Sequence, residues 1–563
     1  MQVLLRTLLA FVVMLPCSNL FAQLSQGGQP LAASGHFKAL PSNEVLPPLD
    51  MEFIRARDKQ DEENGALRKF GQFIFTDISP ATHGEWTSLP DGSRVWRMAV
   101  TSPGALGLSL RFDRFHLPEG AKLFAYRPDL KEVRGAFTNW NNRSSGSFAM
   151  GIIRGSTVIL EYTEPANVAG KFELHLNRVG HAYRDIRPMK QTRAFGDSDT
   201  CQVNVHCPEG DNWQDQIKSA VGIEIDTGFF MSWCSGVLMN NTNQDYTPYI
   251  LSAEHCGQSL FGGLYPASIF ENWVFYFDFE APGCNNPQSD NGLYNKAITG
   301  AVVRCNSDDG GGNSGSDMLL MELMDTIPAN WGQFYAGWNA ENLGSSSGVS
   351  VHHPSGDIKK ISTYTTPLVS ESWGDVTPDT HWQVFWSATQ SGHGVTEGGS
   401  SGSPIFDANG HVIGNLTGGS SFCDATGDPD EYGKLSFHWD QNGTTPERQL
   451  MHWLDPSGTN QTIFDGTYQL ITSREEVEND LPPALSVYPN PSSGLLNIAL
   501  PSSYAGEGKA QLQDVTGREV FASPLSFTGG KAQLDARGLP NGIYILQVQA
   551  NGERSHWKMQ ISR

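Results

Sequence analysis

Ser401 lies in a run of glycines and serines that could expose a reactive hydroxyl group. The run reads Gly398-Gly399-Ser400-Ser401-Gly402, and the strand-like pair Ile405-Phe406 follows it. Glycines permit a tight turn in which several backbone N–H groups point at one spot. A serine that attacks a carbonyl needs such donors, here the N–H groups of Gly399 and Ser401, where negative charge develops. Taken alone, a run of this composition is more often an ordinary loop.

A base and an orienting acid are available beside two other apolar runs. His255 stands next to Cys256, shortly after the strand-like Ile250-Leu251, and a bridged cysteine would hold it rigidly. Asp317 directly precedes the apolar run Met318-Leu319-Leu320-Met321. Taken singly, His255 reads as a core or surface histidine and Asp317 as a turn residue. Together with a serine they supply the base, the orienting acid and the nucleophile of an acyl-transfer site.

The composition predicts that β-strands position these residues. The chain of 563 residues holds 60 Gly, 32 Pro, 14 Trp, 15 Tyr and 29 Phe, which is the balance of a turn-rich β protein. Its length corresponds to about three or four domains. Alternating runs at 93–100, 106–112 and 155–162 predict a cysteine-free β domain from about 71 to 185, folded as a sandwich.

Residues 1–22 read as a signal peptide, so we expect an exported chain. Arg6 precedes an apolar run from Leu8 to Pro16, and Ala22 offers a small residue for cleavage. That run is too short to span a bilayer and no later run reaches about 18 apolar residues, so we expect no membrane span. The net charge of −22 argues against a phosphate-neutralising surface and therefore against a nucleic-acid partner.

Export makes disulfide bonds the natural use of the cysteines. Seven cysteines remain after the signal peptide, all in the middle of the chain, which predicts three bridges and one free thiol. On the sequence alone the pairing stays open. No CxxC pair or Cys/His cluster has the spacing of a zinc site, so we expect no metal.

Two segments flank the predicted sandwich. From Gln23 to Asp61 the sequence is polar and interrupted by prolines, which predicts a loose leader. The stretch 188–195 carries Lys190 and Arg193 ahead of the first mature cysteine. It is either an ordinary exposed linker or a site of proteolytic maturation, where a cut after Lys190 or Arg193 would release the segment 23–195.

The order of His255, Asp317 and Ser401 resembles that of the chymotrypsin-like serine proteases. From about 196 to 468 the sequence resembles more specifically the bacterial lysyl endopeptidases. The matching stretches are Cys207-Pro208-Glu209-Gly210, Leu238-Met239-Asn240-Asn241-Thr242, Val351-His352-His353-Pro354, Gly394-Val395-Thr396-Glu397 and Trp453-Leu454-Asp455-Pro456. The resemblance implies a mainly β chain in which a chymotrypsin-like double β-barrel follows a β-sandwich-like propeptide.

The resemblance also assigns roles. His255 becomes the general base, Asp317 its orienting acid and Ser401 the nucleophile, while the N–H groups of Gly399 and Ser401 form the oxyanion hole. It leaves Cys305 unpaired and implies the disulfides Cys201–Cys423, Cys207–Cys284 and Cys234–Cys256. We expect a monomer that hydrolyses protein or peptide substrates through an acyl-enzyme, with no cofactor and no metal.

Specificity requires a charge at the bottom of the substrate pocket. Trypsin-like relatives carry an acid shortly before the nucleophile, where this chain has Val395. Lysyl endopeptidases use a later aspartate instead, and Asp430 matches it. A buried carboxylate with few competing donors would prefer the compact ammonium of Lys to the wide guanidinium of Arg. The resemblance adds Trp373 and the run Thr417-Gly418-Gly419 to the substrate-binding set.

Besides Cys305, three positions depart from the pattern of the relatives. Glu254 stands where relatives often carry a second histidine, and Thr417 replaces a histidine that stacks on the tryptophan matching Trp373. The pH profile and the strictness for Lys are therefore open. Ser400 replaces the aspartate that pairs with a new N-terminus in chymotrypsin-like zymogens, so we expect loss of the N-terminal domain to uncover or complete the site.

A charged, proline-ended linker over 469–483 precedes a small β module over 484–563. Its stretches 487–494, 514–520 and 538–546 resemble the C-terminal sorting domain of Bacteroidetes type IX secretion cargo. The resemblance implies an Ig-like fold, passage through the periplasm by the type IX secretion machinery, and release or attachment at the cell surface. The alternative is a small Ig-like spacer or carbohydrate-binding module.

Three functions are thus compared. The first is a secreted serine endopeptidase that cleaves after Lys. The second is the same enzyme with Arg/Lys or broader specificity. The third is a non-catalytic binding protein on a protease scaffold, since a fold does not dictate a function.

Overall fold

The structure of the chain is a computed structural model. It describes residues 25–184, 198–287, 296–469 and 486–562, apart from residues 38, 64–65, 260–261, 375, 489, 491, 500–505, 514–517 and 551–552. The predicted signal peptide, the junction with Lys190 and Arg193 and nearly all of the predicted linker at 469–483 lie outside these residues. Two compact units are present, Met1–Leu470 and Ile471–Arg563, and each is described by itself.

The N-terminal part of the first unit contains the expected β sandwich. One sheet has the order β1-β4-β9-β6-β7, with β3 paired to β4, and the other contains β2-β10-β5-β8. The strands of the first sheet are β1 (Asn43–Val45), β3 (Glu85–Ser88), β4 (Arg94–Thr101), β6 (Lys122–Tyr126), β7 (Val133–Phe137) and β9 (Thr157–Glu164). Those of the second are β2 (Lys69–Ile78), β5 (Gly107–His116), β8 (Phe148–Arg154) and β10 (Glu173–Ala182).

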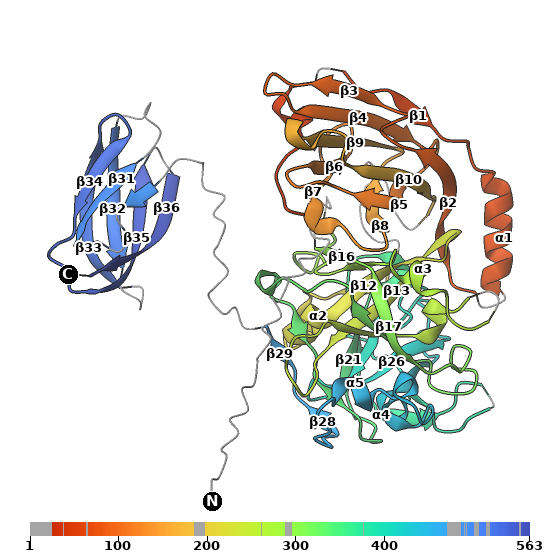
Figure 1. Cartoon of the computed structure of the whole chain (residues 1–563). Coiled ribbons are helices and arrows are strands. Elements are labelled where there is room, and N and C mark those ends of the chain that lie inside the picture. Colours follow the sequence, from red (N-terminus) through yellow and green to blue (C-terminus); the bar gives the residue numbers. More distant parts are fainter. Residues whose placement is uncertain are drawn as a thin grey trace, which may run out of the picture. The chain divides into compact units, whose positions relative to one another are not determined.

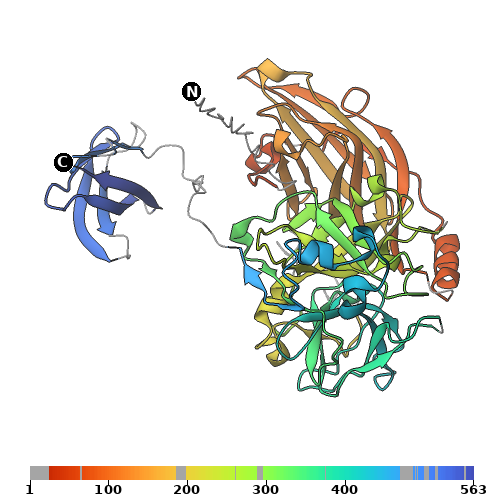
Figure 2. The ribbon, with the colours of Figure 1, turned by 60° about the horizontal axis from the view of Figure 1, so that its bottom comes forward.

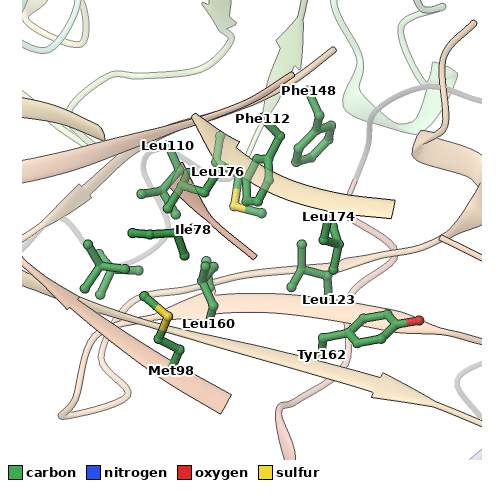
Figure 3. Close-up of a cluster of buried hydrophobic side chains, with 14 of the residues drawn as sticks. Ile78, Met98, Leu110, Phe112, Leu123, Phe148, Leu160, Tyr162, Leu174 and Leu176 are labelled. Atoms are coloured by element: carbon green, nitrogen blue, oxygen red, sulfur yellow. The ribbon is translucent and has the colours of Figure 1, made fainter. Parts of the chain in front are cut away.

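One apolar core lies between these two sheets. Met98 and Leu160 approach it from the first sheet, and Leu110 and Leu176 from the second, and all four are buried. Figure 3 shows these side chains pointing toward one another. The alternating runs detected in the sequence correspond to β4, β5 and β9, because alternation places every second side chain in this core.

The segment expected to be a loose leader is more regular than predicted. It contains β1 and the helix α1 (Met51–Glu63). The prolines precede the helix rather than interrupt it, and the Asp50 carboxylate accepts a hydrogen bond from the Phe53 N–H at 3.1 Å, as a helix N-cap does. Only Ile54 and Asp58 of α1 are buried. The helix therefore lacks the apolar pattern from which a helix is predicted.

The remainder of the first unit forms two β-barrels. The first barrel contains β12 (Ala220–Asp226), β13 (Phe230–Met239), β14 (Tyr249–Ser252), β15 (Val274–Tyr276), β16 (Ala297–Thr299), β17 (Ala301–Asn306) and β18 (Leu319–Leu323). The second is built mainly from β11 (Val203–Asn204), β20 (Trp338–Asn339), β21 (Gly348–His352), β22 (Lys360–Tyr364), β23 (Val369–Glu371), β24 (His381–Val384), β25 (Pro404–Phe406), β26 (Val412–Gly419), β27 (Asp430–Lys434) and β28 (Ile463–Phe464).

Short elements complete this part of the chain. The two-residue strands β19 (Phe334–Tyr335) and β29 (Thr467–Tyr468) pair with each other. The helices are α2 (Gln214–Ser219), α3 (Ala267–Phe270), α4 (Leu435–Asp440) and α5 (Met451–Leu454). Among the described helices, none has both the length and the apolar character that crossing a membrane requires.

The sandwich and the first barrel share one sheet. β2 pairs antiparallel with the start of β13, with Phe230 opposite Gln72 and Met231 opposite Gly71. The far end of β13, from Val237 to Met239, pairs with β14 instead. Figures 1 and 2 show the N-terminal strands, in red and orange, packed against the barrels, in yellow to blue.

The second unit is a small β sandwich. Its two sheets have the orders β30-β31-β34 and β33-β32-β35-β36. The strands are β30 (Ser486–Tyr488), β31 (Leu495–Ala499), β32 (Gly506–Gln513), β33 (Glu519–Phe527), β34 (Lys531–Asp535), β35 (Gly542–Ala550) and β36 (Glu553–Ile561). Leu496, Leu512 and Leu546 are among the buried residues of the core between them.

Candidate active site

His255 and Asp317 are joined by two hydrogen bonds at one end of the first barrel. The His255 Nδ1 atom lies 2.7 Å from Asp317 Oδ2, and the His255 backbone N–H donates to Asp317 Oδ1 at 2.9 Å. The Asp317 side chain is fully buried, whereas the imidazole keeps 20% of its surface exposed. A base oriented by a buried acid while its outer edge stays accessible is suited to proton transfer.

The backbone around these two residues is held in place from several sides. His255 belongs to the short 3-10 helix η5 (Glu254–Gly257), and the disulfide Cys234–Cys256 ties that helix to β13. Asp317 has a φ of 61°, a left-handed conformation that Asp tolerates better than most residues. The Asp317 N–H donates to Asp309 Oδ2 at 2.8 Å, and the Asn415 side chain donates to the Asp317 carbonyl at 3.0 Å.

The Ser401 loop packs directly against the first barrel. The Ser235 N–H of β13 donates to the Ser401 carbonyl at 2.8 Å, and the Ser235 hydroxyl donates to the Gly399 carbonyl at 2.9 Å. Gly402 has a φ of 79°, and a Cβ there would lie 2.2 Å from Ser252 Oγ. The loop can therefore approach the end of β14 only because this position is glycine.

Two amides of this loop remain free of protein acceptors. The N–H groups of Ser400 and Gly402 donate to the Glu397 and Leu416 carbonyls at 2.9 and 2.8 Å. Within the described residues, the intervening N–H of Ser401 and that of Gly399 make no such bond. An oxyanion hole requires donors that are not already engaged.

Ser401 lies beside the His255 segment without a hydrogen bond between the two side chains. The Ser401 carbonyl is 3.9 Å from Cys256 Sγ, next in sequence to His255. No hydrogen bond joins Ser401 Oγ to His255 Nε2 in the described part of the chain. Such contacts are often long in the absence of substrate and tighten when it binds.

The charges around His255 raise its pKa. Burial alone lowers the pKa, but the Asp317 carboxylate, its hydrogen bond, and the charges of Asp309 and Glu254 more than offset burial. The resulting pKa of His255 lies above the ordinary pKa of histidine. These acids favour the imidazolium ion that a general base becomes when it accepts a proton.

Asp430 is a buried carboxylate that four donors contact. Its Oδ2 atom accepts from Trp386 Nε1 at 2.6 Å, Thr396 Oγ1 at 2.8 Å and Ser421 Oγ at 2.6 Å. Its Oδ1 atom accepts only from the Ser421 N–H, at 3.1 Å. The expectation of few competing donors is therefore wrong, because β27 places Asp430 against polar groups of three neighbouring segments.

The two oxygens of Asp430 nevertheless differ in their surroundings. A Cβ at Gly419 would lie 2.1 Å from Asp430 Oδ1, so only glycine fits against this oxygen. Burial raises the pKa of Asp430, although its hydrogen bonds oppose the effect. No Lys or Arg of the described residues forms an ion pair with it. A substrate cation would supply the missing positive charge.

Trp373 lies against the run Thr417-Gly418-Gly419, close to Asp317. A Cβ at Gly418 would be 2.8 Å from the Trp373 ring, and a Cβ at Gly312 would lie within 3.3 Å of Trp373, Thr417 and Asp317. His381 was not among the predicted site residues, yet its Nε2 atom lies 2.9 Å from Thr417 Oγ1. Its ring centroid is 6.1 Å from that of Trp373. An imidazole is thus present beside Thr417, supplied by β24.

The structure contains the three disulfides that the resemblance implies. They are Cys201–Cys423, Cys207–Cys284 and Cys234–Cys256. Cys305 on β17 is a buried free thiol, and burial raises its pKa. It packs in the core cluster that includes Met318.

The N-terminal part reaches the site through the segment before β2. A pocket of about 180 Å³ lies beside His255, and Ala66, Leu67 and Lys69 form part of its lining. A Cβ at Gly398, three residues before Ser401, would lie 3.3 Å from the Arg68 side chain. The segment Ala66–Lys69 therefore occupies space immediately next to the base and the serine loop.

Comparisons with known proteins identify two matching family models and a curated relative. Residues 195–433 match the family model described as lysyl endopeptidase, C-terminal domain. Residues 486–562 match the secretion system C-terminal sorting domain. A lysyl endopeptidase of Pseudomonas aeruginosa is 29% identical over 436 residues, which cover 73% of this chain and 86% of that protein.

Two solved structures are also similar. A Glu endopeptidase in complex with MPD shares 15% identity and a TM-score of 0.27, covering 43% of this chain and 94% of that one. The thermostable serine protease AL20 from an extremophilic microorganism shares 16% identity and a TM-score of 0.27, covering 38% and 90%. From the family models and the curated relative, the chain is a serine endopeptidase, secreted or attached to the cell surface, that is similar to lysyl endopeptidases over residues 195–433 and to a secretion sorting domain over residues 486–562.

Proposed function

We propose that the protein cleaves peptide bonds after Lys, with Ser401 as nucleophile, His255 as general base and Asp317 as the acid that orients His255. The observation that carries the proposal is the 2.7 Å contact between His255 Nδ1 and Asp317 Oδ2, next to the Ser401 loop. This contact holds the Nδ1–H tautomer, which leaves Nε2 free to accept a proton.

In the first half of the reaction, Ser401 Oγ attacks the scissile carbonyl carbon and His255 Nε2 takes its proton. The carbonyl oxygen becomes negative and receives hydrogen bonds from the N–H groups of Gly399 and Ser401. The carbon–nitrogen bond then breaks, and His255 returns the proton to the leaving amine. The product is an ester between the substrate and Ser401.

In the second half, water hydrolyses that ester by the same steps. His255 removes a proton from the water, the hydroxide attacks the ester carbon, and Ser401 leaves as its hydroxyl with the proton returned by His255. The catalyst is regenerated, and the sequence of steps uses no metal and no cofactor.

Asp430 would provide the preference for Lys. Its Oδ1 atom accepts a single hydrogen bond, so this oxygen could accept another from an ammonium group. The three donors on Oδ2 keep the carboxylate fixed. A single oxygen that can still accept a hydrogen bond suits the point charge of Lys better than the two-pronged guanidinium of Arg.

The segment 23–195 would act as a propeptide ahead of the protease domain at 196–468. The position of Ala66–Lys69 beside His255 supports a covering role, and so does the packing of Arg68 on Gly398. Cleavage after Lys190 or Arg193 would allow this segment to leave. A signal peptide at 1–22, the linker 469–483 and the sorting domain 484–563 would direct export through the periplasm to the type IX machinery.

The decisive experiment is digestion of a diverse peptide mixture by the matured protein, with Ser401→Ala as the matched control. New termini are identified by mass spectrometry. We expect cuts after Lys that the control lacks. Cuts after Arg or uncharged residues would retain the protease but overturn the Asp430 argument.

A fluorophosphonate probe distinguishes the enzyme from a binding protein on the same scaffold. It should label the matured protein and fail to label Ser401→Ala, because it reacts only with an activated serine. Absence of both labelling and cleavage in a correctly matured sample would overturn the proposed function. Sequencing the N-terminus of the mature protein locates the maturation site, which we expect between Gln191 and Gly196.

A further inference from the structure

Glu254 is a buried acid immediately before the proposed general base. It is 1% exposed, and its backbone N–H donates to the Asp317 carbonyl at 3.2 Å. Its carboxylate faces the segment between β17 and β18. There its Oε2 atom accepts from Ser307 Oγ at 2.6 Å and from the Asp309 N–H at 3.2 Å.

Asp309 connects this carboxylate to Asp317. The Asp309 side chain is 7% exposed, and its Oδ2 atom accepts from the Asp317 N–H at 2.8 Å. Its Oδ1 atom accepts from the Gly312 N–H at 2.8 Å. A continuous set of hydrogen bonds therefore runs from Glu254 through Asp309 and Asp317 to His255.

Among the described residues, His255 is the only titratable cation hydrogen-bonded to this group of acids. The charge of Asp317 also acts on His381, but burial lowers the pKa of His381 to about 4 and keeps it neutral. Asp308, beside Asp309, is paired with Arg448 at 2.6 Å. His438 lies behind Ser316 and is neutral, because burial lowers its pKa to about 3. Within the described chain, no three His, Cys, Asp or Glu side chains are arranged to hold a metal ion.

The surroundings of Glu254 place its titration near neutrality. Burial is the largest influence and raises its pKa, the Ser307 hydroxyl lowers it, and the charge of Asp309 raises it again, to about 7. Glu254 in turn contributes to the raised pKa of His255. The two groups are thus coupled across a distance of one residue in sequence.

We propose that Glu254 is a positioning residue that tunes His255 from behind: its ionised carboxylate stabilises the His255 imidazolium, and its protonation withdraws that support. This inference rests on the proposed role of His255. Below neutral pH the acid cluster loses one negative charge and His255 becomes a weaker base. Above neutral pH the full charge is restored and the proton leaves Ser401 more easily.

The test is Glu254→Gln, which removes the charge while the amide oxygen can still accept from Ser307. The values of kcat and KM for a Lys peptide amide are measured from about pH 5 to 9. We expect kcat at high pH to fall about three- to tenfold with KM unchanged, and the midpoint of the rising limb to move about one unit lower. The rising limb should also approach that of a single titrating group, because one of two coupled groups is gone.

Glu322→Gln is the matched control. Glu322 lies on β18 of the same barrel and pairs with Arg304 at 2.8 Å, so the substitution removes the same charge away from His255. Its pH profile should superimpose on that of the parent enzyme. An unchanged profile for Glu254→Gln as well would overturn the inference and leave Glu254 as a packing residue.

Ser307→Ala provides an independent variant if Glu254→Gln does not fold. The Ser307 hydroxyl lowers the pKa of Glu254, so its loss should keep Glu254 protonated to higher pH and move the rising limb to lower pH, in the same direction as Glu254→Gln but by less. A shift to higher pH, or none, would contradict the inference.

A measurement without turnover separates this inference from the proposed function. In the Ser401→Ala background, the low-field proton on His255 Nδ1 is followed by NMR across the same pH range. Adding Glu254→Gln should lower its titration midpoint by about one unit. If the parent enzyme cleaves nothing but this midpoint shifts, the proposed function fails and the coupling stands; an unshifted midpoint overturns the coupling.

Discussion

Two buried groups of acids in the first unit are neutralised in different ways. At the interface between the sandwich and the first barrel, Glu224 and Asp226 of β12 meet Arg111 of β5 at 2.8 and 2.9 Å. Arg178 of β10 adds a second contact to Asp226 at 2.9 Å. Behind His255, by contrast, Glu254, Asp309 and Asp317 have backbone N–H groups, one serine hydroxyl and one imidazole as partners.

The first group of acids holds two domains together, whereas the second acts on a side chain that changes its charge. A guanidinium stays charged at every pH that a protein survives, so the interface acids are permanently paired. The imidazole gains and loses its proton near neutrality, so the acids behind it act on a charge that changes during each turnover. Burial is similar in both places, and the partner decides whether it produces a fixed contact or a responsive one.

The largest expected effect comes from removing the contact between Asp317 and His255. Asp317→Asn removes the acceptor that holds the Nδ1–H tautomer of His255, and we expect kcat to fall about 10⁴-fold. The measurement is hydrolysis of a Lys ester by the matured enzyme. Near-normal turnover would show that His255 is not oriented through Asp317. Retained fluorescence and melting behaviour would verify that the variant still folds.

Breaking the fixed side at Arg111 should affect stability instead. Arg111→Met leaves Glu224 and Asp226 short of their principal cation, and we expect a loss of about 3–5 kcal/mol in the free energy of unfolding. The measurement is denaturant unfolding of the uncleaved chain in the Ser401→Ala background.

Arg114→Met is the control for this prediction. Arg114 is an exposed arginine of the same strand, and its substitution should change the free energy of unfolding by no more than about 0.5 kcal/mol. Equal losses in the two variants would mean that the charge of Arg111 has no special role at the interface.

Asp430 extends the comparison to a buried acid that has no ion pair among the residues the structure describes. We expect Asp430→Asn to reduce kcat/KM for Lys substrates about 100-fold and to leave uncharged substrates nearly unaffected. Because burial raises the pKa of Asp430, the KM for Lys substrates should rise as the pH falls through that raised value. Asp430→Asn should lose this dependence.

The exposed Asp428 supplies the matching control, and Asp428→Asn should behave as the parent enzyme. If Asp430→Asn kept its preference for Lys, the cation would be recognised elsewhere.

The smallest effect is expected where the buried group carries no charge. Cys305→Ala should cost about 1 kcal/mol in the free energy of unfolding and leave kcat unchanged. Because burial raises the pKa of the Cys305 thiol, the native parent should resist alkylation at pH 8 and react only after unfolding. Rapid native alkylation would show that Cys305 is accessible.

The sequence predicted the features that are local in the chain. Ser401 among glycines, His255 beside a cysteine and Asp317 before an apolar run are each recognisable from a few neighbouring residues. The sandwich strands could also be predicted, because side chains alternate along β4, β5 and β9. The three disulfides required the family resemblance, since spacing alone allows many pairings.

Features created by contacts between distant segments were not predictable in this way. Asp309 lies in a glycine-rich loop and acquires its place only when the Asp317 N–H turns back onto it. His381 reaches Thr417 from a neighbouring strand. Glu224 and Asp226 alternate with the buried Ile223 and Ile225, a pattern that normally places acids in solvent, yet a second domain covers them.

The shared sheet gives the order of the chain a role in folding. β2, β5 and β10 all precede β12 and β13, so the sandwich can form before Phe230–Ser232 has been synthesised. Its open edge then offers a register for the first half of β13, which shortens the search for a pairing between distant segments. A chain made without residues 25–184 would have to close its first barrel while the first half of β13 lacks β2 as a partner. It should therefore fold more slowly and aggregate more readily.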